Sequence, residues 1–150
     1  MRKYVICFWL SMALLSLSVI PVSAAAPLVR TDARHVISRS AVVIAAAQKA
    51  AKLGNQYMGL GKAVAHQRFA RILFRNGYYF RAIAHSLRAR ALAVEVIRLN
   101  KAAIVEEAAL DQKEQNYTPK LPSDKDLDQK VEKDLGKDDA AADIGVDLPN

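Results

Sequence analysis

The pattern of hydrophobic and polar positions predicts helices through the middle of this 150-residue chain. Between residues 78 and 99 there is no proline, and apolar residues recur every three or four positions, which is the spacing of one helix face. These residues are Phe80, Ile83, Leu87, Ala91, Val94 and Ile97. A second row carries only small side chains, namely Ala82, Ser86, Ala89 and Ala93. We therefore expect this helix to pack against neighbours on two sides.

A shorter helix is predicted immediately before it, over residues 62–75, with Ala65, Phe69 and Leu73 on its apolar side. Asn76 and Gly77 separate the two helices. Gly77 suits the left-handed conformation that ends a helix, and Asn76 tolerates it. The two segments are therefore expected to form an antiparallel helical hairpin with a tight turn.

Small, turn and aromatic residues of this hairpin stand at the spacing of a tetratricopeptide (TPR) unit: Ala70, Gly77, Tyr79, Ala82, Ile83 and Ala89. Residues 63–96 thus resemble one copy of that repeat. The pattern departs from the family at His66, where tryptophan is usual, and at Val94, where proline is usual, and no second copy is visible. The resemblance implies a helical hairpin that normally stacks in an array of about three repeats. A generic alanine-rich hairpin is the alternative.

The preceding helix is expected over residues 33–53, after Thr31 and Asp32, which are typical of a helix start. The connector that follows, residues 54–61, is glycine-rich. It does not match a phosphate loop, because Gly61 and Lys62 are followed by Ala63. An ordinary helix–helix turn is the expectation here.

Beyond Leu99 the pattern allows two interpretations. Asn100 and Lys101 are typical of a break, whereas the alanine-rich residues that follow favour continuation of the same helix to about Gln115. We favour continuation. The helical domain is accordingly placed at residues 27–115, and the fold class is all-α: a small three- to four-helix bundle or a TPR-like helical hairpin.

Residues 1–24 have the pattern of a signal peptide. Arg2 and Lys3 precede an apolar stretch at residues 4–20, and the small residues Val22 and Ala24 suit cleavage after Ala24. Cleavage one residue later suits the pattern nearly as well, and an uncleaved membrane anchor is the alternative. Export to the periplasm or the medium is therefore predicted. Cysteine occurs once, in the apolar stretch, so no disulfide is expected after cleavage.

Charge divides the chain in two. Residues 27–114 carry fifteen Lys/Arg and six Asp/Glu, a balance of +9, and residues 115–150 carry five and nine, a balance of −4. Residues 116–150 are charged and poor in apolar side chains, which predicts a disordered acidic C-terminal tail. Asp124, Asp126 and Asp128 alternate as in a calcium loop, but Gln129 stands where glycine is needed and Leu135 where glutamate is needed.

The basic hairpin is the candidate functional surface. Arginines recur along one side of its first helix and on the polar face of its second, and guanidinium groups bind carboxylates and phosphates through paired donors. Tyrosines at the turn could stack on a ring. The predicted partner-binding residues are Arg68, Arg71, Arg75, Tyr78, Tyr79, Arg81, His85 and Arg88, with Arg90 nearby.

Catalytic and metal sites are not expected. His66 and His85 are nineteen residues apart around Gly77 and could lie at comparable height, but cysteine is absent and acids are few around them. No nucleophile or carboxylate completes a catalytic set, and no cofactor is predicted. The sequence favours an exported, non-enzymatic binding or adaptor protein that engages an acidic protein partner. The alternatives are a polyanion-binding protein, for nucleic acid or anionic lipid, and a basic face that is merely solvated.

Overall fold

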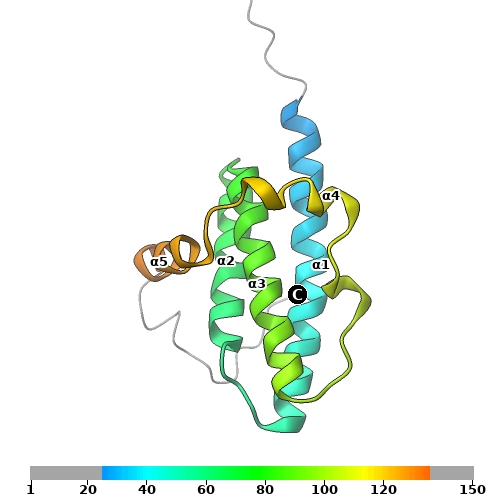
Figure 1. Cartoon of the computed structure of the whole chain (residues 1–150). Helices are drawn as coiled ribbons and strands as arrows, with labels where there is room; N and C mark the ends of the chain where they lie inside the picture. Colours follow the sequence, from blue (N-terminus) through cyan, green and yellow to red (C-terminus); the bar gives the residue numbers. More distant parts are fainter. Residues whose placement is uncertain (1–24, 136–150) are drawn as a thin grey trace, which may run out of the picture.

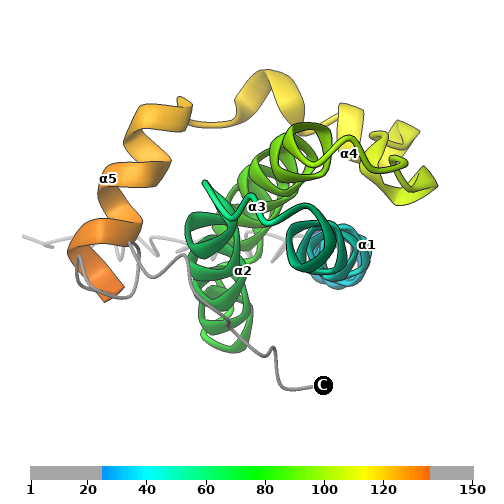
Figure 2. The ribbon, with the colours of Figure 1, turned by 90° about the horizontal axis from the view of Figure 1, so that it is seen from below.

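The computed structural model describes residues 25–135, and every regular secondary-structure element among them is a helix (Figure 1). Three long helices pack side by side as a small bundle, and residues 100–135, here called the strap, run back along it (Figures 1 and 2). The predicted all-α class is confirmed. The helices are α1 (Ala25–Gly54), α2 (Leu60–Arg75), α3 (Tyr79–Leu99), α4 (Gln112–Gln115) and α5 (Asp124–Leu135), with 3₁₀ turns at Glu106–Ala108 and Thr118–Lys120.

Helix α3 lies at the centre of the fold. It packs against α1 and α2, and the strap passes over its remaining side (Figure 2). Its predicted small-residue row is fully buried, and Ala89 and Ala93 meet Ala47 and Ala51 of α1 in the largest apolar cluster. Small side chains let the helix axes approach closely, so the predicted packing on two sides is confirmed.

The predicted hairpin of α2 and α3 is also confirmed. Asn76 caps α2, and Gly77 has a φ of 81°, the left-handed conformation that glycine adopts without strain. The backbone N–H of Tyr78 donates to the Leu73 carbonyl at 2.9 Å, which satisfies a group that the end of α2 would otherwise leave unpaired.

Helix α1 begins earlier than predicted. It starts at Ala25 rather than after Thr31 and Asp32, because nothing between these points breaks a helix and Pro27 falls in the first turn, where its missing N–H is tolerated. Asp32 serves another purpose: it accepts a 2.7 Å hydrogen bond from the Tyr117 hydroxyl of the strap.

The predicted continuation of α3 to Gln115 is wrong. The helix ends at Leu99, and Lys101 has a φ of 52°. The Asn100 amide donates to the carbonyls of Val96 and Gln56, each at 2.8 Å, and its oxygen accepts from the Gln56 N–H at 3.1 Å. The hydrogen bonds to the α1–α2 connector stabilise the end of α3 at this point, although the alanine-rich sequence that follows favours a continued helix.

The predicted disordered tail differs from the structure between residues 116 and 135. Helix α5 packs against α2 and α3, and its Leu127 and Val131, one helical turn apart, are 5% and 2% exposed. Average composition conceals such a pair, although two well-placed apolar residues suffice to seat a short helix. No helix within residues 25–135 has the length and apolar character needed to cross a membrane. The signal-peptide prediction and the last fifteen residues of the predicted tail lie outside the described residues.

Candidate functional site

The strap is fastened to the bundle by a buried ion pair. Arg90 of α3 is 2% exposed, and Glu114 of α4 is fully buried. Arg90 donates to both Glu114 carboxylate oxygens, through Nη1 to Oε2 at 2.7 Å and through Nη2 to Oε1 at 2.5 Å. It also donates to Ser40 Oγ at 3.2 Å and to the Val36 carbonyl at 3.3 Å, so this guanidinium joins α1, α3 and the strap.

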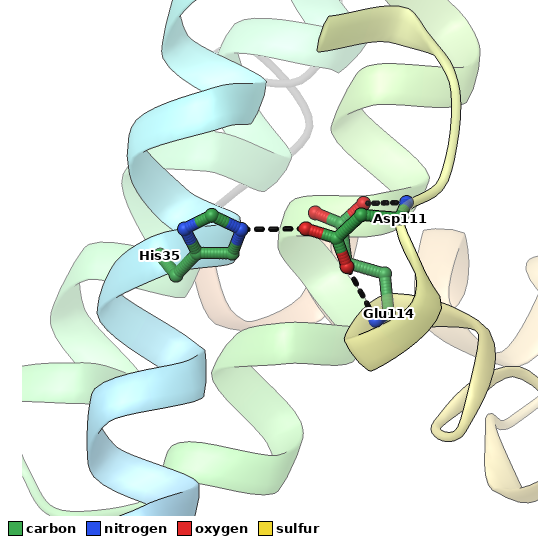
Figure 3. A group of neighbouring side chains, drawn as sticks. All are labelled: His35, Asp111 and Glu114. Atoms are coloured by element: carbon green, nitrogen blue, oxygen red, sulfur yellow. Dashed lines mark hydrogen bonds and ion pairs between the residues drawn. The ribbon is translucent and has the colours of Figure 1, made fainter.

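The short helix α4 positions the side chain of Glu114. Its capping box is reciprocal: Asp111 Oδ1 accepts from the Glu114 N–H at 2.9 Å, and Glu114 Oε2 accepts from the Asp111 N–H at 3.0 Å. Asp111 also lies 2.6 Å from His35 Nε2 on α1 (Figure 3). Burial raises the pKa of Asp111, but the Glu114 N–H, His35 and Arg39 outweigh that effect and hold the pKa below its usual value.

His35, Asp111 and Glu114 also have the spacing of a metal-ligand set, with one possible ligand atom from each within 4.8 Å of the others (Figure 3). Their surroundings argue against a cation. Both Glu114 oxygens are engaged by Arg90, and Arg39 Nε lies 3.6 Å from Glu114 Oε1. Two guanidinium groups thus already neutralise the carboxylate that a metal would need, and we interpret the cluster as a link that holds the strap to α1 and α3.

A second ion pair seats α5. Arg88 Nε and Nη2 donate to the two oxygens of Asp128, each at 2.9 Å, and Nη1 donates to Asp124 at 2.8 Å. The hydrogen bond to Asp128 raises the pKa of Arg88. Arg88 was predicted to face a partner, but its side chain is only 14% exposed and it binds two carboxylates of its own chain. Its predicted role is therefore corrected.

The two histidines of the hairpin meet, as their sequence positions suggested. His66 Nδ1 and His85 Nδ1 are 3.1 Å apart, and His66 Nε2 lies 3.1 Å from Asp128 Oδ1. Burial lowers the pKa of both rings, that of His85 to about 3, where the neighbouring His66 adds to the effect. His85 is 1% exposed, so its predicted place on a partner-binding surface is wrong. The ring lies inward because α5 covers this part of the hairpin.

The remaining predicted residues lie toward the hairpin turn. Arg68 and Arg75 are exposed and Arg71 is half-buried. Tyr78 is 55% exposed, with the Arg81 guanidinium 5.6 Å from its ring centroid. Tyr79 instead packs against Phe74, with the ring centroids 5.4 Å apart. We call Arg68, Arg71, Arg75, Tyr78 and Arg81 the basic end. Within residues 25–135, none of these four arginines forms an ion pair.

Sequence reasoning missed Glu114 and Asp128 as partners of arginines on α3. One signal was present for Arg90: it stands three residues after Leu87 and four before Val94, on the apolar side of the helix, where a charged side chain requires a buried partner. Its partner could not be named from the sequence, since Glu114 is 24 residues away.

No family model, no curated protein and no solved structure matches this chain. The class that the fold itself defines is a small three-helix bundle whose central helix is covered by a C-terminal strap.

Proposed function

We propose that this protein is an exported, non-enzymatic binding protein whose basic end engages an acidic protein partner. The division among the arginines is the observation that carries the proposal. Arg88 and Arg90 are neutralised by carboxylates of the strap, whereas Arg68, Arg71 and Arg75 form no ion pair within the described residues. The strap thus supplies carboxylates to Arg88 and Arg90, and the guanidinium groups of Arg68, Arg71 and Arg75 stay available for a partner.

The chemistry of the basic end suits an acidic protein surface. Each free guanidinium offers paired donors for a carboxylate, and the exposed ring of Tyr78 adds a flat apolar surface beside Arg81. The exposed Arg30 and Arg34 belong to the first turns of α1, which begin at the same end of the bundle (Figure 1). The likeness of the α2–α3 hairpin to a TPR unit is a further reason to propose protein binding.

The alternative is a polyanion, and one observation favours anionic lipid. Helix α1 starts at the end of the bundle where the α2–α3 turn lies (Figure 1). If the apolar residues 4–20 stayed attached and entered a membrane, the basic end would lie close to the lipid surface. Anionic headgroups attract such arginines by about 1 kcal/mol each.

The test uses two triple charge reversals with the same change in net charge. One replaces Arg68, Arg71 and Arg75 by glutamate. The control replaces the exposed residues Lys49, Lys52 and Arg98 by glutamate, in the last turns of α1 and α3 at the opposite end of the bundle (Figure 1). Each protein is crosslinked in an envelope extract of its own organism, and binding to phosphatidylglycerol vesicles and to DNA is measured across a salt series.

The proposal expects one dominant acidic protein that the control retains and the basic-end variant loses. Equal capture by all three proteins would refute it. Binding only to vesicles or DNA, with steep salt dependence and loss in the basic-end variant, would replace it by the alternative.

A further inference from the structure

A cavity of about 240 Å³ lies between the N-terminal half of α3 and the strap. Of the residues of the basic end, Arg81 alone lines it. Phe80, Ala84 and Leu127 supply apolar wall, and the buried His85 also lines the cavity. Arg81 of α3 and the exposed Lys130 of α5 bring two cations to its rim.

A chain of hydrogen bonds sets the proton positions behind this cavity. Asp128 accepts from Arg88 and is therefore ionised, so the facing Nε2 of His66 must carry a proton to donate to it. Because burial keeps His66 neutral, its Nδ1 is a lone pair and accepts from the Nδ1–H of His85. The remaining nitrogen, His85 Nε2, is then an unprotonated acceptor.

This acceptor has no hydrogen-bond partner in the part of the chain that the structure describes. The ring cannot turn away easily, because His66 binds its other nitrogen and Phe69 packs edge-on against it at 4.7 Å between centroids. Burial lowers the pKa of His85 to about 3, and His66, Arg81 and Lys130 add to that effect. The nitrogen therefore stays an acceptor at neutral pH, able to accept a hydrogen bond from a donor bound in the cavity that His85 lines.

The charges at the rim favour an anion. Arg81 and Lys130 form no ion pair within residues 25–135. Asp126 also lines the cavity, but it accepts a 2.6 Å hydrogen bond from the Ser123 hydroxyl, and the two cations outnumber it.

The geometry points to a binding site for a small hydroxy acid in this cavity. Its carboxylate would lie between Arg81 and Lys130, its hydroxyl would donate to His85 Nε2, and its apolar body would pack against Phe80 and Leu127. Arg81 and His85 are four residues apart on one helix, so their Cβ atoms lie about 6 Å apart. 4-Hydroxybenzoate carries the two groups at opposite ends of an apolar ring and is the probe we choose.

The test titrates the whole protein, with ¹⁵N-labelled histidine, with three probes and follows the imidazole nitrogens by NMR. 4-Hydroxybenzoate has both groups, benzoate lacks the donor, and 4-hydroxybenzyl alcohol lacks the anion. We expect 4-hydroxybenzoate to shift the His85 Nε2 resonance saturably. Removal of either group should weaken binding about fivefold or more, as for one lost hydrogen bond or ion pair.

Two lysine variants on α5 give a matched pair that leaves the buried histidines untouched. Lys130→Gln removes a rim cation and should weaken 4-hydroxybenzoate binding about fivefold. Lys133→Gln removes an exposed cation that does not line the cavity and should leave binding unchanged. The proposal is overturned by the absence of a saturable His85 shift up to about 10 mM probe. Equal affinity for the three probes, or equal behaviour of the two variants, would also overturn it. Neither variant alters Arg68, Arg71 or Arg75, so the result is independent of partner binding.

Discussion

Glu114→Gln tests whether the strap is an integral part of the fold. Glutamine keeps the size of the side chain and an oxygen that can still accept from the Asp111 N–H, so the capping of α4 is largely retained. The charge is lost, and the amide N–H₂ takes the place of the oxygen that accepted from Arg90 Nη2. The Arg90 guanidinium, 2% exposed, is then left with a neutral partner.

The expected cost follows from the burial of both groups. Removing one partner of a buried ion pair typically destabilises a protein by about 3–5 kcal/mol, because the other charge stays desolvated. Arg90 keeps its hydrogen bonds to Ser40 and Val36, which places the expected loss near the lower value, about 3 kcal/mol. A domain of this size has a free energy of unfolding of about 5–15 kcal/mol, so the loss is a large share of the total.

Urea denaturation followed by far-UV circular dichroism measures this loss. With an m-value of about 1.5 kcal/mol/M, the midpoint should fall by about 2 M at an unchanged slope. The control is Glu106→Gln, an exposed glutamate of the same strap, which should change stability by less than about 0.5 kcal/mol.

A loss below about 1 kcal/mol in Glu114→Gln would refute the reasoning. It would mean that the strap opens at little cost and lets water reach Arg90. Hydrogen exchange distinguishes the two situations, because an opening strap exchanges the Glu114 N–H much faster than amides in the middle of α3. Slow exchange at Glu114 in the unaltered protein is what the buried ion pair predicts.

Two further predictions concern His85 and the glycines. The pKa of His85 is about 3 when folded and near 6.5 when unfolded, so below pH 6.5 the unfolded state binds more protons. The contribution of His85 to the free energy of unfolding should therefore be constant above pH 6.5. It should fall by up to about 1.4 kcal/mol per pH unit as the pH drops toward 3. Urea titrations at pH 7 and pH 5 would show this, and His85→Gln should reduce the difference. Gly54→Ala should destabilise by about 2–3 kcal/mol, because the new Cβ would overlap the Asn100 side chain that binds Gln56. Gly77→Ala, with a φ of 81° and open space around it, should lose only about 1 kcal/mol from backbone strain. Similar losses at the two glycines in thermal denaturation would contradict the close approach of Asn100.

The features that sequence predicted correctly depend on neighbours within a few residues. The spacing of Phe69, Leu73, Ile83 and Leu87 indicates the buried faces of α2 and α3, and Gly77 indicates the turn between them. Such periodicity arises from the geometry of a single helix, so it can be recognised before any partner is known. The contact between His66 and His85 also follows from the hairpin, since a tight turn brings positions on its two sides together.

The failures have the opposite character. Alanine-rich sequence after Leu99 favours a helix locally, but Asn100 finds partners on the α1–α2 connector and the helix ends. The acidic stretch around Asp128 looks solvated by composition, yet the pair of Leu127 and Val131 seats it on α2 and α3. In each case contacts between distant segments outweighed the local preference.

The candidate site shows the same limit. By itself the sequence determined an all-helical bundle, a tight hairpin and an excess of arginines on that hairpin. Tertiary structure decided which arginines are occupied: Arg88 meets Asp128 and Arg90 meets Glu114, 40 and 24 residues further along the chain. Helix periodicity places a charge on a face, whereas its partner depends on how the whole chain returns over that face. Only the folded strap therefore separates the arginines that form ion pairs within the described residues from those that form none.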